Sequence, residues 1–427
     1  MAALSIILLL VGVAGAVGRP LRLPAWVVPA VAVCVDLAAG AISPESARRA
    51  VDPLGAPIGF LLAAVPLAIL LDRLGFFSAV AAILARRGHG AGALWVVGAL
   101  VTTVLNLDAG VVLLTPLYAG FARRSGRDPF ALAAQPVLLA CLASSALPVS
   151  NLTNLIAQSE TGAGTAAFAT HLGAPSLVAC VVGWWCYRRA LPGALVAAAP
   201  GTGREAGAGE AGAGAGEARA KPTDGVAGSE GAGAGGRRAL AIGGVVTGVV
   251  LVGFTAGRAV GLEPWMVALG GDVVLIVVLR LVPWRHVPLG TALVAGSLGV
   301  LAAAAAGHLP VGDLIGGTTV AALARTAGVT ALAANVFNNL PALLVALPFI
   351  GHHPTPALWA VLIGVNMGPV LLVTGSLASL LWLDALGRLG VEVRARDFTR
   401  IGVRVGLPAA AAGLAVQLLL RAAGLAA

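Results

Sequence analysis

The stretch Asn106-Leu-Asp108-Ala-Gly-Val-Val-Leu-Leu-Thr115-Pro116 is a polar, proline-containing interruption in otherwise apolar sequence. A second one, Asn335-Val-Phe-Asn338-Asn339-Leu-Pro341, lies in the other half of the chain. Each is followed by one further apolar stretch and then by a serine-containing break, Leu147-Pro148-Val-Ser150-Asn151-Leu-Thr153-Asn154 or Gly375-Ser376-Leu-Ala-Ser379-Leu-Leu-Trp382. Broken hydrophobic segments at corresponding places in two halves are typical of secondary transporters, whose substrate binds where the repeats meet.

The composition places the chain in a lipid bilayer. Of its 427 residues, 59% are hydrophobic and 11% are charged, too little polar side chain to cover a soluble domain of this size. Many apolar stretches approach the roughly 20 residues that a helix needs to cross a membrane. We therefore expect an all-α polytopic protein of the plasma membrane with about 10 to 11 transmembrane helices, two re-entrant or broken-helix hairpins and an inverted structural repeat.

A change of composition divides the chain. From Pro192 to Arg238 the sequence is rich in Gly, Ala and Glu without an apolar period, which predicts a flexible linker between membrane halves 1–191 and 239–427. Arginine pairs at both ends of the linker predict that it is cytoplasmic. The first apolar run, Ala2 to Val17, has no basic segment before it, and Arg19 and Arg22 follow it instead. This favours a retained transmembrane helix over a secretory signal peptide.

Seven asparagines stand at the interruptions, and their amides carry both hydrogen-bond donors and an acceptor. In hydrocarbon an interrupted helix persists only where it is buried in protein or lines a water-filled cavity. The amides could close unwound helix ends and also meet a neutral, polyhydroxylated or hydrated solute, while capping or helix linking alone is the alternative for each. Their clustering in both halves favours a shared substrate site built from Asn106, Ser150, Asn151, Thr153, Asn154, Asn335, Asn338, Asn339 and Ser376.

Asp108 is the strongest candidate for coupling transport to protons, because a carboxylate in an apolar segment is costly and usually marks an ion or proton path. Asp36 and Asp272 are rival carboxylates, which could instead pair with an arginine or lie at a helix end. No lysine or arginine falls within the interruptions, and Arg325 is ten positions before Asn335. This favours a neutral or cationic solute, although helix N-termini can hold anions without a charged side chain.

Other classes of function receive little support from the sequence. The four cysteines match neither a zinc motif nor a disulfide framework, and the six histidines lie near predicted span ends, so we expect no metal site and no cofactor. The arginines flank membrane segments and aromatic residues make up only 5%, which argues against nucleic-acid binding. The chain has no P-loop signature. It also has no paired base at a motif's spacing, so we expect no enzyme.

These segments resemble the arsenical pump membrane protein ArsB family, within an ion transporter superfamily that also holds Na+/H+ antiporters and anion/Na+ symporters. The segment most specific for this family runs from Asn366-Met-Gly368-Pro369 through Gly375-Ser-Leu-Ala-Ser-Leu-Leu-Trp382. The resemblance implies export of arsenite or antimonite through the lipid membrane, by proton antiport or with a separate soluble ATPase. Many relatives carry Asn directly before the first Asp, whereas Leu107 precedes Asp108 here. A Na+/H+ antiporter or anion/Na+ symporter of the same superfamily is the alternative.

Overall fold

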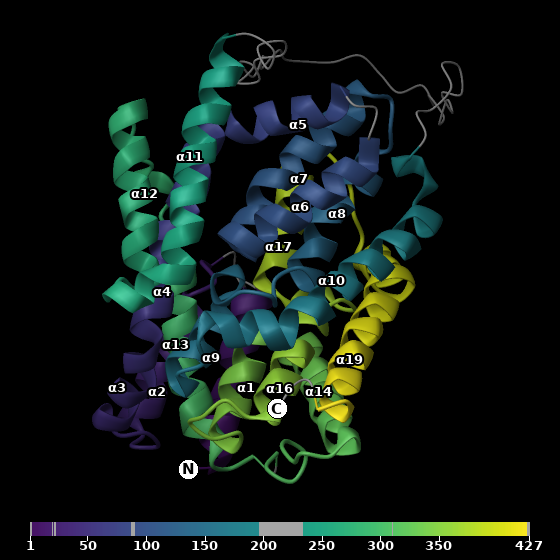
Figure 1. Cartoon of the computed structure of the whole chain (residues 1–427). Coiled ribbons are helices and arrows are strands. Elements are labelled where there is room, and N and C mark those ends of the chain that lie inside the picture. Colours follow the sequence, from purple (N-terminus) through teal and green to yellow (C-terminus); the bar gives the residue numbers. More distant parts are fainter. Residues whose placement is uncertain are drawn as a thin grey trace, which may run out of the picture.

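The computed structural model describes residues 2–18, 20, 23–86, 90–195, 234–309 and 311–424, which form helices and no strand (Figure 1). Within these residues, six helical segments are long and apolar enough to cross a membrane, and seven shorter apolar helices accompany them. The expected all-α polytopic membrane fold is confirmed. Most of the predicted linker, residues 196–233, lies outside the described residues, as do Arg19 and Arg22.

The first half consists of a peripheral helix pair, a long helix, a helical hairpin and a discontinuous helix. Its elements are α1 (Ala2–Gly18), α2 (Val27–Ala38), α3 (Pro44–Val51), α4 (Gly55–Arg73), α5 (Phe76–Arg86), α6 (Gly90–Leu105), α7 (Leu107–Arg124), α8 (Pro129–Leu142), α9 (Leu152–Thr161) and α10 (Thr165–Ala190). A short 3-10 turn, Pro148–Ser150, stands in the unwound stretch between α8 and α9.

The second half repeats this order. Its elements are α11 (Ala234–Ala256), α12 (Pro264–Leu279), α13 (Leu289–Ala306), α14 (Val320–Phe337), α15 (Asn339–Ala346), α16 (Pro356–Met367), α17 (Leu377–Arg388), α18 (Ala395–Ile401) and α19 (Leu407–Ala422). A 3-10 turn, Val373–Gly375, precedes α17 as Pro148–Ser150 precedes α9. The hairpin α6–α7 thus corresponds to α14–α15, and the discontinuous helix α8–α9 to α16–α17.

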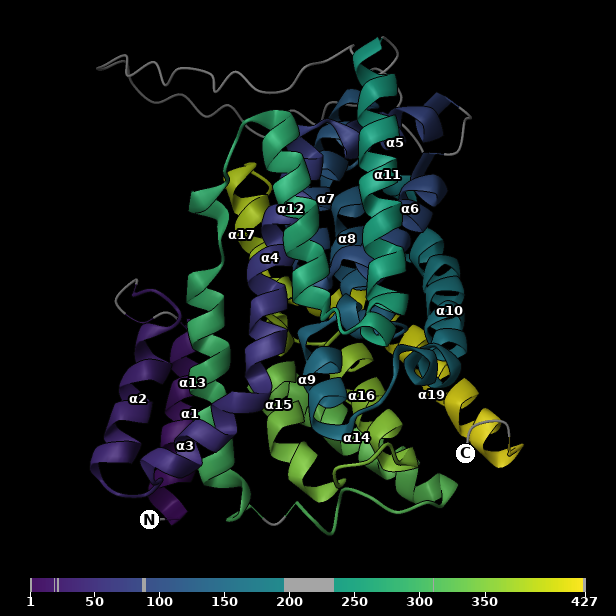
Figure 2. The same cartoon turned by 60° about the vertical axis from the view of Figure 1, so that its left-hand side comes forward.

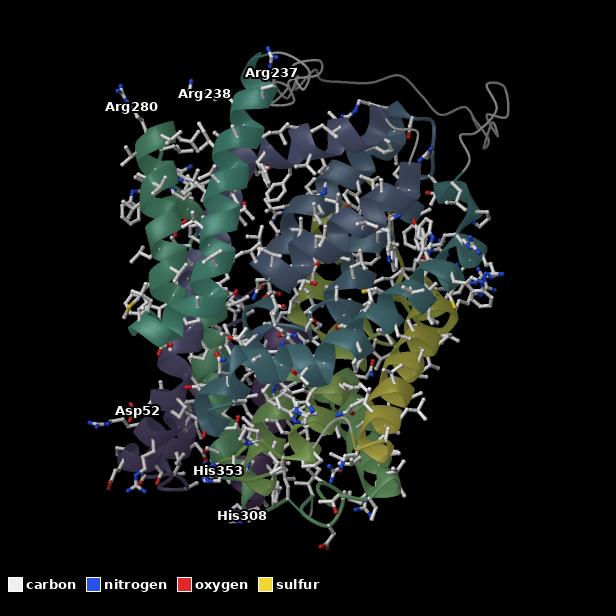
Figure 3. All side chains as sticks on the ribbon, in the orientation of Figure 1. Asp52, Arg237, Arg238, Arg280, His308 and His353 are labelled. Atoms are coloured by element: carbon white, nitrogen blue, oxygen red, sulfur yellow. The ribbon has the colours of Figure 1, made fainter. Side chains whose placement is uncertain are left out.

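The two halves run in opposite directions through the molecule. Figure 3 places Arg237, Arg238 and Arg280 at one end, which we call the arginine end, and Asp52 and His308 at the opposite end. Helix α4 follows Asp52 and therefore starts at this opposite end. The corresponding helix α13 leads to His308 and therefore finishes there. The expected inverted repeat is therefore visible in these two corresponding helices.

The peripheral helices of each half pack against helices of the other half. Helix α12 packs along α4 and α11 packs on α5, whereas α1 and α2 pack on α13 (Figure 2). The buried cluster of Leu9, Val13 and Ala32 with Leu298 and Leu301 fills the contact between α1, α2 and α13. The two halves are thus interlocked rather than placed side by side.

The chain reverses direction within the α6–α7 segment, so that this hairpin enters and leaves the protein on the same side. A Cβ on Gly110 of α7 would lie 3.2 Å from Thr102 Oγ1 of α6, and one on Gly98 would lie 3.2 Å from Tyr118 Oη. Helices α6 and α7 therefore lie against each other on either side of Asn106. Helices α14 and α15 likewise pack on one another, and the two hairpins occupy opposite ends of the molecule (Figure 2).

The second hairpin is held by a very close approach of α14 and α16. A Cβ on Gly364 of α16 would lie 2.0 Å from Thr330 Oγ1 and 2.5 Å from the Ala327 carbonyl oxygen of α14. One turn later, a Cβ on Gly368 would lie 2.4 Å from the Ala331 Cβ. Such small residues let helix backbones meet in a membrane, where packing and hydrogen bonds rather than the hydrophobic effect drive association.

We predict that Gly364→Ala destabilises the protein, because the added methyl group has no room and overpacking costs about 1–3 kcal/mol. The measurement is the melting temperature of the purified protein in detergent. Gly328→Ala on α14 is the matched control, since a Cβ there meets nothing within 4 Å. Equal melting temperatures for the two variants would contradict the close contact.

Candidate functional site

Asn106 and Asn338 form the tips of the two hairpins. Their backbones share one unusual conformation, with φ 134° and ψ 151° at Asn106 and φ 82° and ψ 152° at Asn338. Positive φ is rare for residues other than glycine, and asparagine is among those that tolerate it best. Each amide oxygen caps the following helix, accepting from Asp108 N at 2.8 Å and from Leu340 N at 3.3 Å. The repeat therefore equates Asn106 with Asn338.

Asn151 and Ser376 are the equivalent caps of the discontinuous helices. Asn151 has φ −148° and ψ 140°, and Ser376 has φ −147° and ψ 145°. The Asn151 Oδ1 accepts from Thr153 N, and the Ser376 Oγ accepts from Ala378 N, both at 3.2 Å. This backbone geometry pairs Asn106 with Asn338 and Asn151 with Ser376, although the quoted motifs begin at Asn106 and at Asn335.

In the first half, the hairpin is bound to the unwound stretch that follows α8. Thr103 Oγ1 donates to the Ala143 carbonyl oxygen at 2.9 Å, and Ser150 Oγ donates to the Thr103 carbonyl oxygen at 2.6 Å. Ser150 is fully buried. Its hydroxyl proton is thus engaged within the protein and fixes the hairpin next to the broken helix.

In the second half, Asn335 connects the hairpin to the unwound stretch after α16, and every donor and acceptor site of its amide has a partner. Its Nδ2 donates to the carbonyl oxygens of Ala331 and Gly368, at 2.9 and 2.8 Å. Its Oδ1 accepts from Leu371 N and Leu372 N, both at 3.0 Å. An amide offers two donors and two acceptor sites, so in this conformation Asn335 closes free backbone groups of the unwound stretch after α16.

The tip of the second hairpin is also engaged. Asn338 Nδ2 donates to the Thr374 carbonyl oxygen at 3.1 Å, and Thr374 Oγ1 donates to the Asn335 carbonyl oxygen at 3.2 Å. Asn339, the first residue of α15, is buried beside it. These contacts bind the tip of α14–α15 to the unwound stretch before α17.

A cluster of amide and hydroxyl groups joins the two halves at the start of α9. Asn366 of α16 receives hydrogen bonds at its Oδ1 from Asn151 Nδ2 at 3.0 Å and from Thr153 Oγ1 at 2.6 Å. Its Nδ2 donates to Asn154 Oδ1 at 2.7 Å. Asn154 Nδ2 in turn donates to the carbonyl oxygens of Ser144 and Leu147, both at 2.9 Å. All four cluster residues, Asn151, Thr153, Asn154 and Asn366, are buried.

Asp108 lies in the first turn of α7, beside the first tip, and its Oδ1 is buried without a hydrogen-bond partner. It is the innermost residue of a face of α7 that continues through Val112 and Pro116, both exposed. The rival carboxylates lie in the peripheral helices. Asp36 of α2 accepts from Ser5 Oγ at 3.0 Å, and Asp272 is buried on α12. Asp108 alone of the three stands at a hairpin tip.

The structure thus brings the nine predicted substrate residues and Asp108 to the two tips and the two unwound stretches. Sequence reasoning left Asn366 out of this site although it stands at a polar break, and it missed Thr103, whose position corresponds to Asn335. The position of Thr103 in the repeat, three residues before the tip asparagine, is the signal that could have found it. Among the described residues, no group of three His, Cys, Asp or Glu is placed to hold a metal ion.

Two surface pockets are lined by residues other than those of the predicted site. One is lined by Ala56, Leu155 and Glu263 among others, and another by Ile69, Trp284 and Arg285 among others. Neither includes a predicted site residue. The tip asparagines Asn106 and Asn338 are buried in the conformation described.

We predict that Asn366→Ala destabilises the protein strongly, because Asn151, Thr153 and Asn154 would each lose a buried partner at about 1–3 kcal/mol per group. Cys141→Ala is the control, since the repeat places Cys141 at the position of Asn366 and its Sγ makes only a 3.6 Å contact with the Pro369 carbonyl oxygen. The melting temperature should fall much further for Asn366→Ala. A similar fall in both variants would mean that the cluster does not bind the halves together.

Comparison with curated proteins confirms the resemblance inferred from the motifs. The chain is 27% identical over 382 residues to the arsenical pump membrane proteins of Yersinia enterocolitica, Escherichia coli (strain K12) and Shigella flexneri. Each alignment covers 81% of this chain and 82% of the relative. The similarity therefore extends over most of the length of both chains.

A family model described as that of a citrate transporter, CitMHS, matches residues 4–364. The match extends through both hairpins and the α8–α9 break and ends within α16. Together with the apolar helices, it makes the protein a multi-pass transporter of the cell membrane and not an enzyme. By this match over most of its length, the chain belongs to the CitMHS citrate transporter family.

Proposed function

We propose that this protein is a secondary active transporter that exports trivalent arsenic or antimony, as the uncharged hydroxide, in exchange for protons. The arsenical pump membrane proteins among its relatives suggest the solute. The observation that carries the choice is the chemistry of the tips: amides, hydroxyls and one carboxylate, with no lysine or arginine in the four interrupted segments. Amide and hydroxyl groups suit a small solute whose own hydroxyls both donate and accept.

Asn106 and Asp108 are the proposed contacts of solute and proton. A carboxylate within a membrane segment is costly, and such residues commonly form proton relays. Asp108 lies next to the tip, and its Oδ1 has no hydrogen-bond partner. It is therefore suited to take up and release a proton as the solute passes. Solute contacts by the other eight candidates stay a prediction, since most of them are engaged within the protein in this conformation.

Alternating access is the proposed mechanism of transport. The two hairpins approach from opposite ends in an inverted repeat, and in such folds one bundle moves against the other around a site at the midplane. A solute shifts this equilibrium only by binding one state more tightly than the other. The arginine end, with Arg237, Arg238 and Arg280, is the proposed cytoplasmic face, because cytoplasmic loops carry an excess of arginine. A separate soluble ATPase could dock on that face.

Anion transport with sodium is the second candidate function, and one observation favours it. Helices α7, α9, α15 and α17 all begin at the tips and breaks, at Leu107, Leu152, Asn339 and Leu377. The N-terminus of a helix attracts anions through its free N–H groups and its dipole. The name of the matching family, citrate transporter, agrees with an anionic solute.

We predict that everted membrane vesicles with an acidic interior accumulate arsenite when they contain this protein, and that Asp108→Asn reduces this uptake to background, because the amide cannot carry the proton. Radiolabelled arsenite on filtered vesicles provides the measurement. Asp272→Asn is the control, since that carboxylate lies on a peripheral helix. Full uptake by the Asp108→Asn variant would contradict proton coupling at this residue.

We also predict that replacing the pH gradient by a sodium gradient leaves arsenite uptake at background and drives no citrate uptake. The reason is that the tips offer no cationic side chain to a carboxylate solute. Filter assays with radiolabelled citrate and arsenite under both gradients separate the two functions. Sodium-driven citrate movement without arsenite movement would replace the first proposal by the second.

A further inference from the structure

The connection that leads from α12 to α13 differs from its counterpart in the first half. Between α2 and α4 the chain forms the helix α3, whereas residues 280–288 form only one 3-10 turn, Trp284–His286. Helix α3 packs on α13, where Ile42 and Ala47 form a buried cluster with Val300. The inverted repeat assigns residues 280–288 the corresponding place on α4, and the turn contacts that helix. Residues 280–288, all of which the structure describes, contribute no helix to cover this place.

The end of α4 is correspondingly open. A pocket with a volume of about 320 Å³ lies between this end and the connection, lined by Ile69 and Arg73 of α4 and by residues 281–286. Helix α4 runs toward the arginine end, and α12 reaches Arg280 at that end (Figure 3). The pocket therefore lies where two helices finish near the arginine end.

The lining of the pocket combines positive charge with hydrogen-bond donors. Arg73 and Arg285 carry charged guanidinium groups, and the imidazole of His286 donates a hydrogen bond in either protonation state. Among the described residues that line the pocket, none is a carboxylate. Neither arginine forms an ion pair within the described part of the chain, although Asp72 interacts electrostatically with Arg73. The pocket is therefore suited to an anionic group that accepts several hydrogen bonds.

The backbone of the connection is constrained. Pro283 and Pro288 restrict φ on either side of the 3-10 turn, and His286 N donates to the Pro283 carbonyl oxygen at 2.9 Å. Ile69 and Pro283 are buried and form an apolar part of the lining. A preformed pocket binds a ligand without first ordering its own backbone. The arginine and the histidine of the turn are thus carried by a backbone that is already in place.

The exposed side chains of the connection indicate the surroundings of this anion. Leu281 and Val282 are each 40% exposed, and Trp284 is 77% exposed. Tryptophan is enriched where a membrane meets water, because its ring has an apolar body and a polar N–H group. The apolar segments Pro44–Arg73 and Trp284–Ala306, each long enough to cross a membrane, have one end at the pocket. The pocket therefore lies at the level of the lipid headgroups.

We propose that this pocket binds the phosphate group of an anionic phospholipid, with Arg73, Arg285 and His286 as hydrogen-bond donors and Trp284 beside the glycerol region. The planar fork of an arginine donates two hydrogen bonds to one phosphate group. Basic pockets between membrane helices on the cytoplasmic side bind acidic headgroups. The phospholipid covers on α4 the place that α3 covers on α13. The site does not depend on the transported solute, because neither hairpin contributes to its lining.

The test measures phospholipid binding to the full chain in a neutral detergent by native mass spectrometry, with dioctanoyl phosphatidylglycerol and dioctanoyl phosphatidylcholine. The wild type should bind phosphatidylglycerol more tightly. Arg73→Gln and Arg285→Gln should each weaken this binding about fivefold, the contribution of one arginine near an anionic membrane surface. Both side chains are exposed, so the melting temperature without lipid should not change.

Arg238→Gln is the matched control, since it removes an exposed arginine at the same end that does not line the pocket. It should leave the affinity for phosphatidylglycerol unchanged. An equal loss in all three variants would overturn the site, because attraction would then follow total charge. Equal affinity of the wild type for the two phospholipids would overturn it as well.

A further arm distinguishes a lipid headgroup from free phosphate. Inorganic phosphate at millimolar concentration should leave phosphatidylglycerol bound, because it offers no acyl chains to the exposed apolar residues of the connection. Displacement of the lipid by inorganic phosphate would overturn the phospholipid as the ligand and assign the pocket to the free anion.

Discussion

The reversal of the chain at Asn106 and at Asn338 is the constraint on which the rest of the structure depends. Inside a membrane, each such reversal exposes backbone groups that water cannot satisfy, and protein must satisfy them instead. Asparagine can adopt the positive φ of the tip and cap the next helix with its own side chain. The unwound stretches after α8 and α16 then supply further partners, since Ser150 donates to the Thr103 carbonyl oxygen in one half and Thr374 to the Asn335 carbonyl oxygen in the other.

Much of this arrangement could be predicted from the sequence, because interruptions are conspicuous where nearly every neighbour is apolar. The helical class, the two hairpins and the location of the polar residues follow from that contrast. The register of the repeat could not be predicted in the same way. Asn335 resembles a tip residue in the sequence, but the tip is defined by the φ of Asn338, and Asn335 occupies the place of Thr103. Thr103 and Asn335 are of different residue types but both connect a hairpin to an unwound stretch. Matching residues by type therefore gives the wrong register for the repeat.

The contacts between halves were beyond sequence reasoning for another reason. Asn366 meets Asn151, Thr153 and Asn154 across more than 200 positions of the chain, and an isolated asparagine in an apolar helix carries no sign of its partner. The same applies to Thr102, whose free hydroxyl is recognised only when the bound hydroxyl of Thr103 is seen beside it. Which polar groups are used and which remain open is a property of the packed structure.

The exchange of peripheral helices between the halves bears on how the protein is made. Synthesis proceeds from the N-terminus, so α4 enters the bilayer long before α12, the helix that packs along it, exists. In the meantime lipid must cover the face of α4 that α12 later occupies. In the same way, α1 and α2 are synthesised before α13, the helix on which they pack. Assembly of the first half is therefore completed only after translation of the second, and two separately expressed halves could reach the native state only by finding each other in the membrane.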